Sequence, residues 1–307
     1  MEAFYNVAGF QFCLKMPDDS ILWKRMENYA PFKSEIQSVS PDCIFTLELC
    51  DELPGIDAAV LVFKDAPENP GMPRTDILAV DGNFLFDFYP NAVSGCASRL
   101  VVSPDFRQGR MSVCKDGARS LNGRLFGLNN ALMLMFTLST ADKMTLEMHA
   151  SVTVDEGTGY LFLGKSGTGK STHSRLWMNN IPGTSLLNDD NPVVRVMPDG
   201  SVRVFGTPWS GKTPCYINAD YPAGGFVQLN QYKENRIRPM ELFEAYSSLY
   251  SSSSGMKMDE RMSDLLHLTL EKVLEKVPCW YLDCLPDAAA ALLCHKTIAD
   301  GNAACSE

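Results

Sequence analysis

The chain has 307 residues, of which 45% are hydrophobic and 21% charged, a composition typical of a globular protein with room for one large or two moderate domains. Lysine and arginine number 27 against 37 aspartates and glutamates, so the formal net charge is −10. A chain this acidic is a poor partner for nucleic acid or for an anionic membrane. Any anion that binds must therefore be held by a local site.

Neither a membrane span nor a secretory leader is expected. The longest apolar run near the middle, residues 131–136, is far too short to cross a bilayer, and residues 1–4 lack the basic flank and apolar core of a signal peptide. The ten cysteines include no Cys-x-x-Cys pair, which argues against a zinc site or a disulfide framework. We therefore expect a cytoplasmic protein with reduced, mostly buried thiols.

The pattern of residues 1–118 predicts a smaller, strand-rich α/β module. Alternation over residues 5–15 predicts a strand, and residues 18–29 predict a short helix. The turn Asp81-Gly82 lies between two apolar runs and predicts a hairpin. Further strands are expected at residues 43–49, 58–63, 76–80, 83–89 and 99–102. This module contains no recognisable catalytic motif.

Residues 119–307 are predicted to form a second α/β (α+β) domain around a mixed β-sheet. An apolar helix over residues 125–141 is expected to pack on this central sheet. Residues 145–154 alternate between apolar and polar side chains, and the turn at residues 155–159 would fold this strand antiparallel beside the next one. Later predictions are a strand at 185–187, a hairpin around 198–200, strands at 226–229 and 280–282, helices at 239–250, 259–277 and 287–298, and a mobile serine-rich loop at 251–255.

Residues 160–172, YLFLGKSGTGKST, carry the strongest signal in the chain. Four apolar residues predict a buried strand, and the next eight match G-x-x-x-x-G-K-[ST], the P-loop or Walker A motif, at the start of a helix. In such a loop backbone N–H groups surround a polyphosphate, the lysine (Lys170) reaches the β- and γ-phosphates, and the serine (Ser171) ligates Mg²⁺. The predicted nucleotide-binding residues are Gly164, Lys165, Ser166, Gly167, Thr168, Gly169, Lys170, Ser171 and Thr172. A glycine-rich turn that matches by chance is the alternative, and the flanking strand and helix disfavour it.

Two adjacent carboxylates follow the loop. One short helix, a turn and a returning strand separate Lys170 from Asp189 and Asp190, so both acids are expected at a strand end beside the loop. Phosphoryl transfer needs a divalent metal, positive groups around the moving phosphoryl group and a base for the attacking hydroxyl. Two neighbouring carboxylates can divide the metal and base roles. The alternative is an Asn-Asp-Asp-Asn turn made only of good turn formers.

Other polar residues are weaker candidates for the same site. His149, on the polar face of the strand beside the loop's own strand, could reach the phosphates, or it is an ordinary half-exposed histidine. Lys212 could supply a second positive charge to the transferred phosphate, and Trp209 could cover an apolar ligand face; a solvated lysine and a packed indole are the alternatives. Arg195 and Arg203 could contact an anionic substrate, although the pattern favours a solvated sheet face for them.

The succession of His149, the phosphate loop and the Asp189-Asp190 pair resembles the C-terminal catalytic domain of HPr kinase/phosphorylase and its related kinases, over about residues 120–300. That fold is shared with phosphoenolpyruvate carboxykinase, whose loop is similar to residues 166–170. The resemblance implies a carboxykinase-like mixed sheet. It also implies that His149 and Asp189 assist proton transfer and phosphate positioning, while Asp190 helps to hold the divalent metal.

The chain also departs from these relatives. Residues 206–212 occupy the place of the arginine-bearing signature loop of HPr kinases, and the further ligands of a longer carboxykinase cannot be located. The resulting prediction is an ATP- and Mg²⁺-dependent kinase that phosphorylates a hydroxyl, of serine type, on an unidentified protein, peptide or small molecule. The alternatives are a nucleotide-binding or regulatory protein of the same fold with little catalysis, and a carboxykinase. The sequence leaves the oligomeric state open, a homo-oligomer included.

Overall fold

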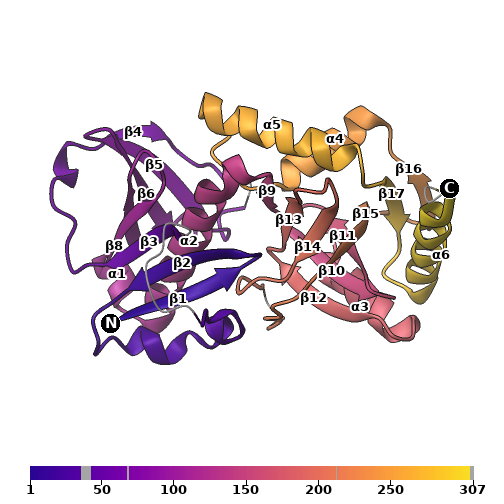
Figure 1. The fold of residues 1–307 in the computed structure, drawn as a ribbon, viewed down its shortest axis with the longest axis horizontal. Helices are drawn as coiled ribbons and strands as arrows, with labels where there is room; N and C mark the ends of the chain where they lie inside the picture. Colours follow the sequence, from indigo (N-terminus) through magenta and orange to yellow (C-terminus); the bar gives the residue numbers. More distant parts are fainter. Residues whose placement is uncertain (36–42, 68, 212, 305–307) are drawn as a thin grey trace. The chain divides into compact units, whose positions relative to one another are not determined.

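The structure, a computed structural model, describes residues 1–35, 43–67, 69–211 and 213–304 and divides into two compact units, Met1–Ser139 and Thr140–Glu307 (Figure 1). The division therefore falls at the last residue of helix α2 (Leu121–Thr140), about twenty residues later than predicted.

Helix α2 was expected to pack on the central sheet of the second domain, but it packs within the N-terminal unit. The ring of Phe136 lies 6.2 Å from that of Phe10, and the Ser139 hydroxyl donates to the Phe106 carbonyl at 2.7 Å. The apolar character of this helix predicted burial correctly, because any sheet face can bury such a surface. It did not identify which sheet.

The N-terminal unit is built on a mixed sheet that, within the described residues, has eight strands in the order β1-β2-β3-β8-β7-β6-β5-β4. Strand β3 pairs in parallel with β2 and β8, and the other pairs are antiparallel. The strands are β1 (Glu2–Val7), β2 (Phe10–Lys15), β3 (Cys43–Leu49), β4 (Val60–Phe63), β5 (Arg74–Val80), β6 (Asn83–Tyr89), β7 (Ser98–Val102) and β8 (Gln108–Val113). The helices are η1 (Ile21–Arg25), η2 (Glu27–Phe32), η3 (Ile56–Ala58), α1 (Lys115–Ala118) and α2.

Turn chemistry explains where the predictions for this unit held and where they did not. The hairpin at Asp81-Gly82 is confirmed. The single strand predicted over residues 5–15 is a second hairpin, which turns at Ala8 and Gly9 with φ angles of 51° and 81°. Alanine rarely adopts a positive φ, so the sequence did not mark this turn. The helix predicted over residues 18–29 is two 3₁₀ segments.

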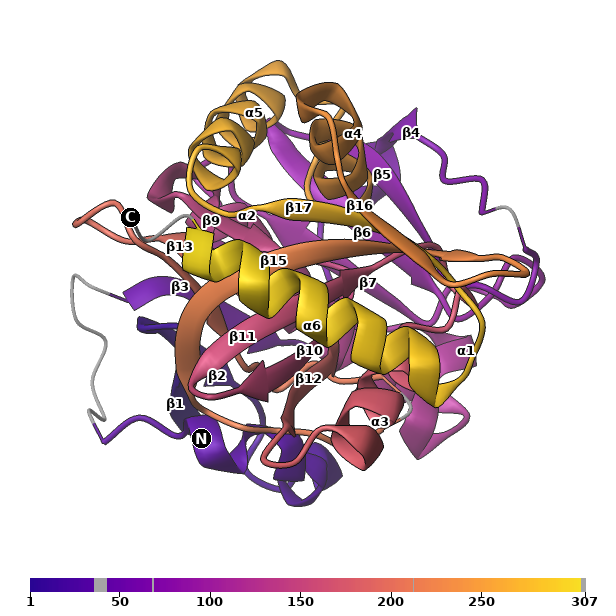
Figure 2. The ribbon, with the colours of Figure 1, turned by 90° about the vertical axis from the view of Figure 1, so that its right-hand side faces the viewer.

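The C-terminal unit contains the second mixed sheet, with the strand order β12-β10-β11-β15-β14-β13-β9 and with β17 joining β15 to β16. Its strands are β9 (Thr145–Glu147), β10 (Ala150–Asp155), β11 (Thr158–Leu163), β12 (Ser185–Asp190), β13 (Val193–Val196), β14 (Val202–Phe205), β15 (Asp220–Gln231), β16 (Arg236–Pro239) and β17 (Cys279–Cys284). Its helices are η4 (Ala141–Lys143), α3 (Lys170–Asn180), α4 (Leu242–Ser252), α5 (Glu260–Leu274) and α6 (Ala288–Ala304). Figure 2 shows α6 lying across the strands. The chain is thus an α/β protein with two mixed sheets.

Strand β11 is at the centre of the C-terminal core. Tyr160 and Phe162 pack in the cluster that includes α3 and α6 residues, whereas Leu161 and Leu163 pack in the cluster that includes α4 and α5 residues. Because helices cover both faces, the strand needs apolar side chains at every position. This explains the continuous apolar run before the glycine-rich loop of residues 164–169.

The strand predicted over residues 145–154 is interrupted. Strand β9 pairs with β13 and ends before Met148. After the interruption at Met148 and His149, β10 pairs with β11 and β12. The antiparallel hairpin between β10 and β11 is confirmed, as is the one between β13 and β14. The polar residues of the run are not on a solvated face: Thr145, Glu147, Ser151 and Thr153 are all buried.

The serine run at residues 251–255 is not a mobile loop. Ser252 ends α4, Ser253 forms a β-bridge with Met148, and both serines are buried. In the part of the chain that the structure describes, no helix combines the length and the apolarity needed to span a lipid bilayer.

Trp177 of α3 is expected to contribute strongly to the stability of the C-terminal unit. Its side chain is fully buried, and its ring lies 5.4 Å from Tyr160 and 5.2 Å from Phe162. Trp177→Ala should lower the free energy of unfolding, measured by urea denaturation, by about 3–5 kcal/mol. The control Leu242→Ala removes a side chain that is 72% exposed, and it should change stability by less than about 0.5 kcal/mol. Equal effects of the two substitutions would contradict this assignment.

Candidate functional site

Three strand ends meet at one edge of the C-terminal sheet. Strand β10 is antiparallel to both of its neighbours, β11 and β12, so its first residue lies beside the last residues of the other two. His149 directly precedes β10, the glycine-rich loop of residues 164–169 follows β11, and Asp189 and Asp190 end β12. The sheet topology therefore brings together three motifs that are separated in the sequence.

The loop between β11 and α3 has the strand, turn and helix arrangement that the sequence predicted. Gly164 and Gly169 adopt φ angles of 147° and 109°, which L side chains rarely tolerate, and Gly169 caps the N-terminus of α3. Gln231 at the end of β15 donates to the carbonyls of Gly167 and Thr168, both at 3.2 Å. The loop is thus held from a second strand end.

Lys170 is the first residue of α3, and its side chain turns back into the loop. Its Nζ donates to the carbonyl of Gly164 at 2.7 Å and lies 2.9 Å from Nε2 of His149. The side chain is buried, and this burial lowers the pKa of the ammonium group, while the carboxylates of Asp190 and Asp189 oppose the shift by favouring the charged form. Lys170 is therefore a desolvated cation directed at the inside of the loop.

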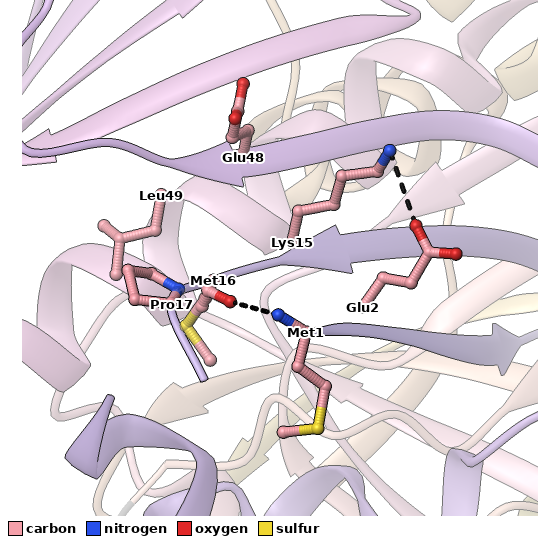
Figure 3. A pocket seen from close by; sticks show the side chains of 7 residues that line it. All are labelled: Met1, Glu2, Lys15, Met16, Pro17, Glu48 and Leu49. Atoms are coloured by element: carbon pink, nitrogen blue, oxygen red, sulfur yellow. Dashed lines mark hydrogen bonds and ion pairs between the residues drawn. The ribbon is translucent and has the colours of Figure 1, made fainter. Parts of the chain in front are cut away.

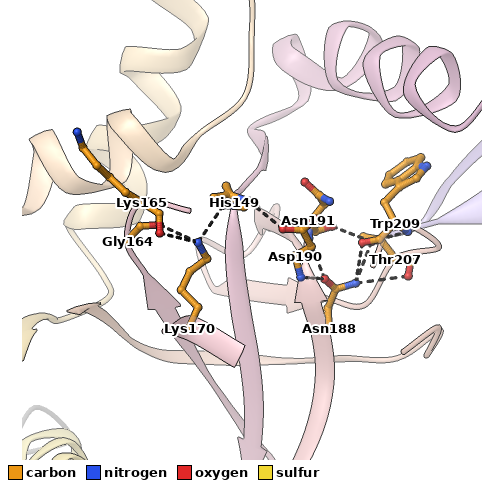
Figure 4. Close-up of polar contacts among 9 residues, drawn as sticks. All are labelled: His149, Gly164, Lys165, Lys170, Asn188, Asp190, Asn191, Thr207 and Trp209. Carbon is orange, nitrogen blue, oxygen red and sulfur yellow. Dashed lines mark hydrogen bonds and ion pairs between the residues drawn. The ribbon is translucent and has the colours of Figure 1, made fainter. Parts of the chain in front are cut away.

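His149 connects this cation to Asp190 (Figure 4). Its Nδ1 lies 3.0 Å from Oδ1 of Asp190, and its backbone N–H donates to the Ser252 carbonyl at 2.7 Å. An ammonium group can only donate hydrogen bonds, so Nε2 accepts from Lys170 and the ring proton is assigned to Nδ1, facing the carboxylate. A continuous polar line runs from the Gly164 carbonyl through Lys170 and His149 to Asp190.

The two aspartates lie on opposite faces of β12, as successive strand residues do. Asp189 is buried and sits across from Ser151, whose hydroxyl contacts that of Ser174 in α3 at 2.6 Å. Asp189 therefore shares the face of α3, whereas Asp190 is partly exposed and contacts His149. Two carboxylates with different surroundings can serve different roles.

Asn188 fixes the end of β12 and was not predicted as a functional residue. This fully buried side chain donates to the Thr207 hydroxyl at 3.0 Å and to the Trp209 carbonyl at 3.3 Å. Its carbonyl oxygen accepts from the backbone N–H groups of Asp190 at 3.0 Å and Asn191 at 2.9 Å. Asn188 thereby sets the position of the acid pair. Its sequence signal, one asparagine in a run of turn formers, does not distinguish this role from a surface turn.

The residues present suit Mg²⁺. Among the described residues no group of three or more histidine, cysteine or acidic side chains is arranged to enclose a metal ion. Mg²⁺ does not require such an enclosure, because it is commonly held by one or two protein oxygens together with phosphate oxygens and water. Ser171 and Asp190 are the oxygen donors proposed from the sequence; Ser171 lies in the first turn of α3, and Asp190 is the last residue of β12.

The other predicted residues are placed as follows. Lys212 lies outside the described residues. Trp209 is buried, which matches a packed indole and not the cover of a ligand. Arg195 and Arg203 are directly opposite each other in the hairpin of β13 and β14. Arg203 forms an ion pair with Asp220 on β15, so a free anion-binding role for it is not supported.

The N-terminal unit has a separate cavity of about 420 Å³ near the chain start (Figure 3). Lys15 forms an ion pair with Glu2 at 3.4 Å, and the Met1 amino group donates to the Met16 carbonyl at 2.9 Å. The cavity is lined by Met1, Glu2, Lys15, Met16, Pro17, Glu48 and Leu49. This lining contains no histidine, and its lysine is paired with Glu2, so it lacks the lysine–histidine–carboxylate line of the C-terminal unit.

Comparison with known proteins gives little further information. No protein-family model matches the chain, and no curated protein sequence matches it. One matching solved structure is that of the Hpr(Ser) kinase/phosphatase from Coxiella burnetii, with 13% identity over 52% of this chain and 99% of that chain and a TM-score of 0.31. This likeness is below the level that establishes a common fold, so function is inferred from the chain's own residues.

The helix that carries Lys170 is expected to make stability depend on pH. His173 is buried behind the loop, accepts from the Trp177 indole at 3.1 Å, and has its pKa lowered to about 4 by burial. Its ordinary pKa near 6.5 applies in the unfolded chain, so between these values the unfolded chain binds more protons. Stability is then fully present above pH 6.5 and falls as the pH drops towards 4.

Chemical denaturation at pH 7.5 and at pH 4.5 tests this expectation. Relative to His173→Gln, the wild type should lose about 2–3 kcal/mol more stability over that range. Comparing the two proteins removes the contribution of the other titrating groups. Parallel pH profiles of the two proteins would contradict the expected role of His173.

Proposed function

We propose that the C-terminal unit transfers the γ-phosphoryl group of ATP to a hydroxyl group. The single observation that carries this proposal is the polar line from Gly164 through Lys170 and His149 to Asp190, with contacts of 2.7, 2.9 and 3.0 Å. This line joins the buried Lys170 ammonium to the Asp190 carboxylate at the edge of the sheet where β12 also carries the more buried Asp189, and this grouping supports the proposal. A loop that bound only an anion would need the cation alone.

Binding of the triphosphate is assigned to the loop and to Lys170. The backbone N–H groups of the loop and the N-terminus of α3 favour negative charge. The ammonium of Lys170 is already desolvated, so a phosphate oxygen that replaces one of its present acceptors gains a charge-assisted hydrogen bond. This arrangement also favours the charge that develops as the phosphoryl group moves.

The chemical step is assigned to the acid pair. The oxygen of the acceptor hydroxyl forms a bond to the γ-phosphorus as the bond to the leaving ADP oxygen breaks, and the hydroxyl proton passes to the Asp189 carboxylate as general base. Asp190 and Ser171 would hold Mg²⁺, which supplies charge neutralisation between the β- and γ-phosphates. His149 orients Asp190 through Nδ1 and Lys170 through Nε2.

A transfer assay tests the proposed function. Protein with γ-labelled ATP and Mg²⁺ is incubated with serine-containing peptides, proteins and small alcohols, and label is followed in the acceptor and in released phosphate. The proposal expects label in at least one hydroxyl-bearing acceptor. Binding of ATP without transfer to any acceptor or to water would instead indicate a nucleotide-binding regulatory protein. Nucleotide-dependent loss of CO₂ from oxaloacetate would indicate a carboxykinase.

Lys170→Met is expected to weaken binding of Mg·ATP by about 10- to 100-fold, because it removes the buried cation and keeps the volume of the side chain. Isothermal titration calorimetry measures the affinity. The control Lys272→Met removes an exposed lysine of α5 that pairs with Glu275, and it should leave the affinity unchanged. Unchanged binding by the Lys170 variant would refute the assignment of the loop.

Substitutions of the two aspartates are expected to separate base from metal ligand. Asp189→Asn should lower the transfer rate by at least about 100-fold and leave nucleotide affinity within about threefold. Asp190→Asn should instead weaken the dependence of nucleotide binding on Mg²⁺. The matched control Asp199→Asn alters an exposed hairpin turn and should change neither quantity. Interchanged effects of the first two variants would refute this division of roles.

A further inference from the structure

Two cysteines of the N-terminal unit are in contact with each other. The Sγ atoms of Cys96 and Cys114 are 3.5 Å apart. Cys96 lies just before β7 and Cys114 directly follows β8, the strand that pairs with β7. The chain segments on either side of the two thiols are therefore held together by the β-ladder.

The backbone around this pair is closely packed. The N–H of Cys114 donates to the Ala97 carbonyl at 2.9 Å, and a Cβ on Gly117 would lie only 2.0 Å from that same carbonyl oxygen. The S–S bond of a disulfide is about 2.05 Å long, so joining the sulfurs requires a shift of about 1.5 Å.

Access and reactivity also distinguish this pair. Among the described cysteines, only Cys50, Cys96 and Cys114 are partly exposed, and the rest are buried. The Cys96 thiol and the nearby Arg99 guanidinium lower the pKa of Cys114, whereas the pKa of Cys96 is raised. Cys114 is thus the thiol that ionises first and attacks, and Cys96 is placed to resolve the product.

We propose that Cys96 and Cys114 form a redox-sensitive pair that is oxidised to a disulfide by a small-molecule disulfide of the glutathione type. The Cys114 thiolate attacks one sulfur of oxidised glutathione, forms a mixed disulfide and releases one glutathione thiolate. The Cys96 thiolate then attacks the Cys114 sulfur and releases the second glutathione. Two protein thiols are oxidised to one disulfide, one glutathione disulfide is reduced, and the two protons of the protein thiols pass to the two released glutathione thiolates, which leave as thiols.

The disulfide would tie together two segments that line one cavity of this unit. The cavity, of about 630 Å³, includes Gly95 and Ala97 from the Cys96 side and Asp116 and Gly117 from the Cys114 side. The crosslink adds a covalent constraint at the end of the β7–β8 ladder. Oxidation is therefore expected to slow amide hydrogen exchange at residues 114–118 and to raise the melting temperature of the unit by about 5 °C.

Mass spectrometry of the wild-type chain after treatment with oxidised glutathione tests the proposal without any variant. A Cys96–Cys114 crosslink that has lost two hydrogen atoms and carries no glutathione is expected, and dithiothreitol should reverse it. A stable glutathione adduct on Cys114 of the wild type, or modification of Cys50 with both other thiols unchanged, would overturn the proposal.

Variants then separate the two steps. Cys96→Ser should accumulate glutathione on Cys114, because the resolving thiol is missing. Cys50→Ser, the matched control for an exposed thiol outside the pair, should form the crosslink at the wild-type rate. If Cys96→Ser does not retain glutathione on Cys114 although the wild type forms the crosslink, the order of attack is wrong.

Discussion

The buried ammonium of Lys170 is the group on which the rest of the site depends. A desolvated cation is stable only if hydrogen-bond acceptors and negative charge surround it. The Gly164 carbonyl and the His149 ring supply acceptors at 2.7 and 2.9 Å, and the nearby carboxylates of Asp189 and Asp190 supply the charge. In the proposed function the same groups would surround a triphosphate and its metal ion. The stability of this cation and the proposed chemistry are therefore two consequences of one arrangement.

Sheet topology determines that arrangement. Antiparallel pairing of β10 with both β11 and β12 brings the start of one strand beside the ends of two others. Because the strand is interrupted at Met148 and His149, the His149 ring can contact both Lys170 and Asp190. The Ser252 carbonyl accepts a hydrogen bond from its backbone N–H. Asn188 then fixes the end of β12 by binding the chain around Thr207. His149 and the acid pair are thus positioned by contacts that lie outside the recognisable motifs.

The sequence was informative where local chemistry decides the structure. A turn such as Asp81-Gly82 and the run of residues 160–172 specify their own conformation through glycine and apolar burial. The sequence was uninformative where a distant partner decides it. The hairpin turn at Ala8 uses a residue that rarely adopts a positive φ, and the serine run at residues 251–255 is fixed by pairing with the chain beside His149. The spacing predicted that the acid pair lies near the loop. Only the strand order shows that His149 lies between the loop and the acid pair.

A crystal structure with Mg²⁺ and a non-hydrolysable ATP analogue tests the central claim most directly. The account predicts phosphate oxygens inside residues 164–172, the Lys170 ammonium bonded to one of them, and the metal ion beside Ser171 and Asp190. The His149 ring should remain bonded to Asp190, because Nδ1 faces that carboxylate already. An analogue bound at another place, or a loop that stays free of phosphate at millimolar analogue with Lys170 still bonded to the Gly164 carbonyl and His149, would contradict the account.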